Sequence, residues 1–156
     1  MSDPKSEIEL GTLSVATMER DGRELMEAHW AEIASDPTVP LDPDWDAYYR
    51  LEKSGKLMSI GAWVGGKLAG YFVGFVLDPH LHYKSWSVVH NDIFYVKPEH
   101  RGGRVAASIT RLVKLTAKGL GLDGIVWHCK PDTVMHSLMD RSPKHRLWEH
   151  TYVQEI

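Results

Sequence analysis

The sequence has little that a secreted, membrane-spanning or nucleic-acid-binding protein requires. Cys129 is the single cysteine among 156 residues, so no disulfide forms within the chain, which favours a reducing compartment. No apolar run approaches the roughly 20 residues of a membrane span, and the segment 1–9 lacks the basic and apolar regions of a signal peptide. The formal net charge of −3 does not favour nucleic-acid binding through a basic surface. These absences predict a cytoplasmic protein with no membrane contact.

The composition and the local patterns predict one folded domain. Hydrophobic residues make up 43% of the chain, which is typical of globular proteins, and the length suits one domain. We expect a flexible tail at 1–9 and a mixed α/β domain at 10–156. Gly65-Gly66 separates two β-rich segments and predicts a hairpin. The expected strands are 12–16, 58–64, 67–77, 86–96, 124–129 and 147–156, and the expected helices are 22–35, 45–51, 105–118 and 134–140.

The most informative segment lies at 93–106, where a strand, a proline-containing turn, a Gly-Gly pair and a helix follow one another. Glycine lets backbone N–H groups approach a ligand, and a helix N-terminus carries partial positive charge. Arg101 and Arg104 add charge suited to phosphate. These parts can cradle a pyrophosphate, although a glycine-rich helix start is more often only a turn. The spacing matches neither the dinucleotide fingerprint nor the P-loop.

This segment resembles the signature of the GNAT superfamily of N-acetyltransferases, Val-x-Pro-x-x-Arg-Gly-x-Gly-x-Gly/Ala. The matching residues are Val96, Pro98, Arg101, Gly102, Val105 and Ala106. The order of elements over about residues 10–156 is also similar, above all to small members from phage and bacteria. The resemblance implies a single GNAT-like domain, with a mostly antiparallel twisted sheet flanked by helices, and an acetyltransferase activity with acetyl-CoA as the co-substrate.

Two departures from the family pattern affect the expected chemistry. Arg104 stands where the family usually has the middle glycine of its Gly-x-Gly. Met139 falls where a tyrosine commonly protonates the leaving thiolate. The resemblance therefore leaves the general acid unassigned.

The resemblance also implies how the cofactor lies. The backbone of the fourth strand would pair with the pantetheine arm where the fourth and fifth strands separate, and an N–H of Tyr95 or Val96 would stabilise the oxyanion. The pyrophosphate would lie on the glycine-rich turn. The implied cofactor-binding residues are Phe94, Tyr95, Val96, Arg101, Gly102, Gly103, Arg104, Val105 and Ala106.

Acetyl transfer needs a neutral amine, and a base can remove the proton of a charged one. Asp92 lies four residues before Val96, near the place of acidic bases in the family; the simpler interpretation is an exposed aspartate. His90 shares the strand face of Asp92 by period-two spacing and is the alternative base, or else a partly buried sheet histidine.

Four aromatic residues, Trp30, Trp45, Tyr48 and Tyr49, flank an acidic loop at 42–46. In the family this region forms one wall of the acceptor site, and an acidic, aromatic wall suits a cationic amine; ordinary helix packing is the simpler interpretation. His80 and His82 could begin a metal site but no third ligand is apparent, so we expect no metal.

The leading hypothesis is an N-acyltransferase that moves an acetyl group to an amine by direct transfer in a ternary complex, since no nucleophile constellation is apparent. The acceptor could be a small molecule, a protein amine or a modified nucleotide, and a homodimer is possible. The alternative is a non-catalytic protein of the same fold that binds or inhibits a partner.

Overall fold

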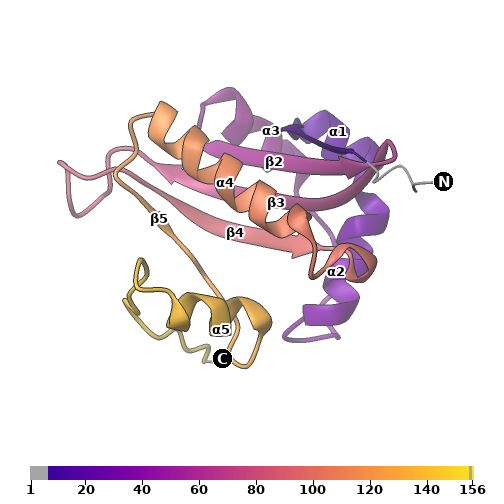
Figure 1. Cartoon of the computed structure of the whole chain (residues 1–156). Helices are drawn as coiled ribbons and strands as arrows, with labels where there is room; N and C mark the ends of the chain where they lie inside the picture. Colours follow the sequence, from indigo (N-terminus) through magenta and orange to yellow (C-terminus); the bar gives the residue numbers. More distant parts are fainter. Residues whose placement is uncertain (1–6, 155) are drawn as a thin grey trace. The chain divides into compact units, whose positions relative to one another are not determined.

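The computed structural model describes residues 7–154 and 156, and the chain forms two compact units, Met1–Val126 and Trp127–Ile156. The first unit contains a five-stranded sheet in the order β1-β2-β3-β4-β5 (Figure 1). This sheet confirms the predicted α/β class. Its strands are β1 Ile8–Thr12, β2 Leu57–Val64, β3 Lys67–Leu77, β4 Val88–Val96 and β5 Gly124–Val126.

The first four strands pair antiparallel in chain order, and β5 joins β4 in parallel. The predicted hairpin turn between β2 and β3 is present. Gly65 and Gly66 have φ values of 57° and 76°, a left-handed conformation that glycine adopts without the steric cost a Cβ brings. The antiparallel pairing of β2 with β3 therefore follows from local turn chemistry together with strand patterning.

Helices cover both faces of the sheet. Gly70 of β3 lies against α4, since a Cβ at this position would meet Ile109 Cδ1 at 3.1 Å. The alternate β3 residues Tyr71 and Val73 belong instead to a core cluster with α1 and α2. Figure 1 shows α4 running across the sheet. The helices of this unit are α1 Val15–Asp21, α2 Arg23–Ile33, α3 Trp45–Lys53, α4 Arg104–Gly119 and the short 3-10 turn Pro98–His100.

The beginning of the chain differs from the expectation. The strand expected at 12–16 is wrong, because β1 ends at Thr12 and α1 begins at Val15. Ser14 caps this helix, with its Oγ accepting a hydrogen bond from the N–H of Thr17 at 3.1 Å; such side-chain caps favour helix starts. Of the predicted tail, residues 1–6 lie outside the described residues, and residues 8 and 9 belong to β1.

The second unit contains α5, Val134–Arg141, close to the predicted 134–140. Thr133 caps it by accepting a hydrogen bond from the N–H of His136 at 3.2 Å. The strand predicted at 147–156 is wrong for the described part of that range, 147–154 and 156, which forms no strand. Alternating residues alone do not make a strand, since a strand also needs a hydrogen-bonded neighbour. No helix in the described residues is long and apolar enough to cross a membrane.

Candidate functional site

A β-bulge shapes the middle of β4. Val73 of β3 pairs with Ile93, whereas the next β3 residue, Gly74, pairs with Asn91, so Asp92 is the extra residue. A bulge bends its strand and re-aims the side chains beside it. The opposing glycine leaves the room that this needs, because a Cβ on Gly74 would lie 2.9 Å from the carbonyl oxygen of His90.

The register with β3 assigns the two candidate bases, His90 and Asp92, to a face of the sheet. His90 pairs with Phe75, and Ile93, three residues later on β4, pairs with Val73. Phe75 and Val73 lie on the same face of β3, so His90 and Ile93 share that face. His90 therefore lies on the sheet face of Tyr71 and Val73. The charge of Asp92 acts on Tyr71 of the same face, so the two candidate bases share that face although the bulge interrupts strict alternation. Asp92 itself is exposed and His90 is half-buried.

The charge of Asp92 affects the pKa values of two nearby tyrosines. Burial first, and the charge of Asp92 second, raise the pKa of Tyr48 on α3 to about 12. Burial and nearby groups, Asp92 among them, also raise the pKa of Tyr71 on β3. Both phenols stay protonated near neutral pH and can donate hydrogen bonds. Asp92 and Tyr48 thus share the α3 side of the sheet.

The parallel ladder between β4 and β5 is short. It joins Val88, Val89 and His90 to β5 and ends at the pair His90↔Val126. The strand β4 continues to Val96, with Phe94 half-buried and Tyr95 and Val96 buried. The segment implied to bind the pantetheine arm therefore lies beyond the last β5 partner.

The turn after β4 leads into α4, the longest helix in the described part of the chain. Gly102 has a φ of 72°, in the left-handed region, and a Cβ there would meet nothing within 4 Å. Gly103 is the N-cap residue of α4 and has no side chain with which to cap the helix. The helix start therefore offers backbone N–H groups and partial positive charge to an anion.

Arg101 faces α2. Its Nη1 and Nη2 atoms donate to the two carboxylate oxygens of Glu32 at 2.8 and 2.6 Å, and its Nε donates to the carbonyl oxygen of Val96 at 2.8 Å. The Tyr95 hydroxyl donates to Glu32 Oε2 at 3.0 Å, and the guanidinium lies 5.1 Å from the centre of the Tyr95 ring. Hydrogen bonding from Arg101 holds the pKa of Glu32 below its usual range.

His29 extends this arrangement into the core. Its ring stacks on Tyr95 with centroids 4.6 Å apart, and its Nδ1 lies 3.1 Å from the Tyr71 hydroxyl. His29 and Glu32 are one helical turn apart on α2, so both reach the same sheet face. The sequence reasoning missed these two residues, because nothing local connects Glu32 to an arginine 69 positions later.

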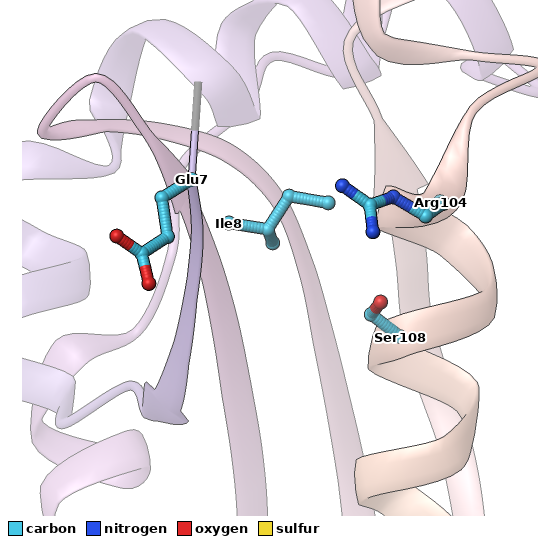
Figure 2. A pocket seen from close by; sticks show the side chains of 4 residues that line it. All are labelled: Glu7, Ile8, Arg104 and Ser108. Atoms are coloured by element: carbon cyan, nitrogen blue, oxygen red, sulfur yellow. The ribbon is translucent and has the colours of Figure 1, made fainter. Parts of the chain in front are cut away.

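Arg104 points in another direction. It lines an open hollow of about 390 Å³ together with Glu7, Ile8 and Ser108. Figure 2 shows its side chain reaching from the first turn of α4 toward Ile8 of β1. The two arginines of the motif thus extend toward different neighbours, Arg101 toward α2 and Arg104 toward β1.

The four aromatic residues expected at the acceptor wall are partly separated. The rings of Trp45 and Tyr48 lie 5.7 Å apart, and both residues pack against the core cluster. Tyr49 turns to α1, where its hydroxyl donates to Glu19 at 2.7 Å. Trp30 is half-buried on α2. Among these four residues, Tyr48, with Trp45 beside it, is the one whose pKa the charge of Asp92 raises.

The remaining candidates belong to other segments of the chain. His80 and His82 belong to an aromatic group with Tyr83 and Trp86 in the loop between β3 and β4. No group of three or more His, Cys, Asp or Glu side chains in residues 7–154 and 156 is arranged to hold a metal ion. Burial raises the pKa of the Cys129 thiol, which disfavours its nucleophilic thiolate form. Met139 lies on α5.

A sequence model of the acetyltransferase (GNAT) family matches residues 21–140. No curated protein matches the sequence. Among solved structures, the aminoglycoside N-acetyltransferase AAC(6')-Iy in complex with CoA is similar at 16% identity, with 100% of this chain and 99% of that chain covered and a TM-score of 0.76.

Two further acetyltransferases have the same fold. The ribosomal-protein-alanine N-acetyltransferase from Brucella melitensis biovar Abortus 2308 is 15% identical over 96% of this chain and 99% of that chain, with a TM-score of 0.70. Glucosamine-6-phosphate N-acetyltransferase from Arabidopsis thaliana is 13% identical over 95% and 99%, with a TM-score of 0.65. At these identities the likeness concerns the fold, and the neighbours act on different acceptors.

Proposed function

Because this chain belongs to the acetyltransferase (GNAT) family, we propose that it transfers an acetyl group from acetyl-CoA directly to an amine. The observation that supports this proposal most strongly is the connection between β4 and α4. There a strand that extends beyond its β5 partner runs into a glycine turn at a helix N-terminus. A strand edge and an anion site in succession suit a ligand with an amide arm and a pyrophosphate.

On the donor side, the backbone of Phe94, Tyr95 and Val96 binds the pantetheine arm. An N–H of Tyr95 or Val96 then stabilises the oxyanion that forms when the thioester carbonyl is attacked. The pyrophosphate lies at the start of α4, where backbone N–H groups and arginine charge meet it. The residues proposed for this anion site are Arg101, Gly102, Gly103, Arg104, Val105 and Ala106.

On the acceptor side, Asp92 is the proposed base. Its exposed carboxylate lies on the α3 side, where it acts on Tyr48. A carboxylate beside aromatic rings attracts a protonated amine and can take its proton before attack. His90 remains the second candidate. The proposed acceptor wall is Trp45 and Tyr48, with Trp30 and Tyr49 as outer members.

The test is acetyl-CoA binding measured by calorimetry, together with CoA thiol release in the presence of an amine library. Gly102→Val should abolish binding, because valine is strained at a φ of 72° and its side chain would stand beside the phosphates. Gly66→Val is the matched control, since Gly66 has a φ of 76° but lies in the β2–β3 turn. Unchanged affinity in Gly102→Val would overturn the proposed anion site.

The second candidate, a non-catalytic binding or inhibitor protein, is favoured by one observation. Met139 stands in place of the tyrosine that commonly serves as the general acid in this family. This candidate takes the lead if acetyl-CoA binds but no amine promotes thiol release.

A further inference from the structure

We infer that Glu32 is a positioning residue for the cofactor turn, acting on the phosphates through Arg101. The inference rests on the proposed function, since it assigns a role toward acetyl-CoA. Glu32 belongs to α2, far along the chain from the glycine turn, and matches no position of the family signature. Its role follows from the contacts that converge on its carboxylate.

Two side chains donate three hydrogen bonds to this carboxylate. Arg101 donates two parallel hydrogen bonds to it, and the Tyr95 hydroxyl donates a third to Oε2. Paired N–H donors fix both the distance and the plane of a guanidinium, which a single contact does not. Glu32 therefore joins α2 to the end of β4 and to the first residue of the turn.

The guanidinium is also held from its other edge. Its Nε donates to the carbonyl oxygen of Val96, the last residue of β4. These bonds occupy three of the five N–H donors of arginine, so the group keeps capacity for a further acceptor. An arginine held in this way has one orientation before the ligand arrives, and less conformational entropy is lost on binding.

The network behind Glu32 resists movement of the turn. Tyr95 is 5% exposed and His29 is 9% exposed, and their rings stack. His29 in turn contacts the hydroxyl of Tyr71, which is 1% exposed. The position of Glu32 is thus set by the core, while the side chains of Glu32 and Arg101 remain 40% and 42% exposed and accessible to a ligand.

The same helix offers a matched control. Glu24 of α2 contacts Lys97, which directly follows β4, with 3.1 Å between Oε1 and Nζ. This ion pair also joins α2 to the cofactor turn. It is a single contact, however, and the Glu24 side chain is 87% exposed. Exposed single ion pairs contribute little, so Glu24→Gln should behave like the unaltered protein.

The experiment compares Glu32→Gln with Glu24→Gln in the full chain. Calorimetry measures the binding of acetyl-CoA and of acetyl-pantetheine, which lacks the pyrophosphate. In Glu32→Gln the Kd for acetyl-CoA should rise about tenfold, the scale of one charge-assisted hydrogen bond, with the Kd for acetyl-pantetheine unchanged. Arg101→Ala should remove the same affinity, and adding Glu32→Gln to it should cost nothing more.

The outcomes separate the inference from the proposed function. If the unaltered protein binds no acetyl-CoA, the proposed function fails. If it binds and Glu32→Gln binds equally well, the inference alone fails. Tighter binding would mean that Glu32 competes with phosphate for Arg101, and equal losses for both ligands would mean a purely structural role; each overturns the inference. Should Glu32→Gln not fold, Glu32→Asp retains the charge and should give a smaller loss confined to acetyl-CoA.

Discussion

Asp92 illustrates how the surroundings of one residue give it a function. Asp92 is the extra residue of a bulge in β4 and is exposed to solvent, whereas Asn91 and Tyr95 of the same strand are buried. A carboxylate that faces solvent can be reached by an acceptor amine and can take its proton.

We predict that Asp92→Asn lowers kcat by about 10²–10⁴-fold, the range for loss of a general base, while acetyl-CoA affinity stays unchanged. Higher pH should restore part of the rate, because more of the amine is then already neutral. The measurement is the steady-state rate of CoA release between neutral and alkaline pH. His90→Gln is the comparison; if it slows the reaction and Asp92→Asn does not, the base is His90. If neither does, the enzyme works chiefly by positioning its reactants.

At the scale of elements, the pairing of β3 with β4 depends on a glycine. Gly74 lies opposite the bulge, where an added Cβ would come within 2.6 Å of Val89 Cγ2 and 2.9 Å of Phe72 Cζ. Both neighbours belong to buried residues. A methyl group therefore has to displace packed atoms or alter the bulge itself.

We predict that Gly74→Ala destabilises the protein by about 1–3 kcal/mol, the cost of overpacking a filled core. Urea unfolding measures the change. Gly11→Ala in β1 is the control, since the nearest atom to its added Cβ is Trp63 Cζ3 at 4.0 Å. Equal stability of the two variants would show that the sheet adjusts freely at the bulge.

At the scale of the whole molecule, the buried phenols of Tyr48 and Tyr71 lower the free energy of unfolding at alkaline pH. The pKa of Tyr48 is about 12 in the folded protein and about 10 in an unfolded chain. Between these values the unfolded state releases the proton first, so the folded state binds more protons and stability falls as pH rises. The raised pKa of Tyr71 adds to the effect in the same direction.

We predict a steady loss of unfolding free energy above about pH 10. Tyr48→Phe should make this loss less steep, because phenylalanine has no proton to release at alkaline pH. At neutral pH the variant should be nearly as stable as the unaltered protein. Urea unfolding at several alkaline pH values measures the slope. An unchanged slope in Tyr48→Phe would assign the alkaline sensitivity to other groups.

The sequence alone determined the features that depend on neighbouring residues. The hairpin at Gly65-Gly66, the helix α4 and the glycine turn before it were predicted close to their observed limits, and the family inferred from that turn is confirmed. Turn conformation and helix periodicity are local properties, so a single stretch of sequence carries them. The assignment of individual residues to the site remains a prediction.

The tertiary structure decided the rest, because it depends on contacts between distant segments. The alternation in 147–156 resembled a strand, yet a strand requires a partner that the segment itself does not encode. The bulge at Asp92 is a property of the register with β3, and the sequence of β4 alone gives no sign of it. The bond between Glu32 and Arg101 likewise appears only when α2 lies beside the end of β4, because folding brings the two charges together.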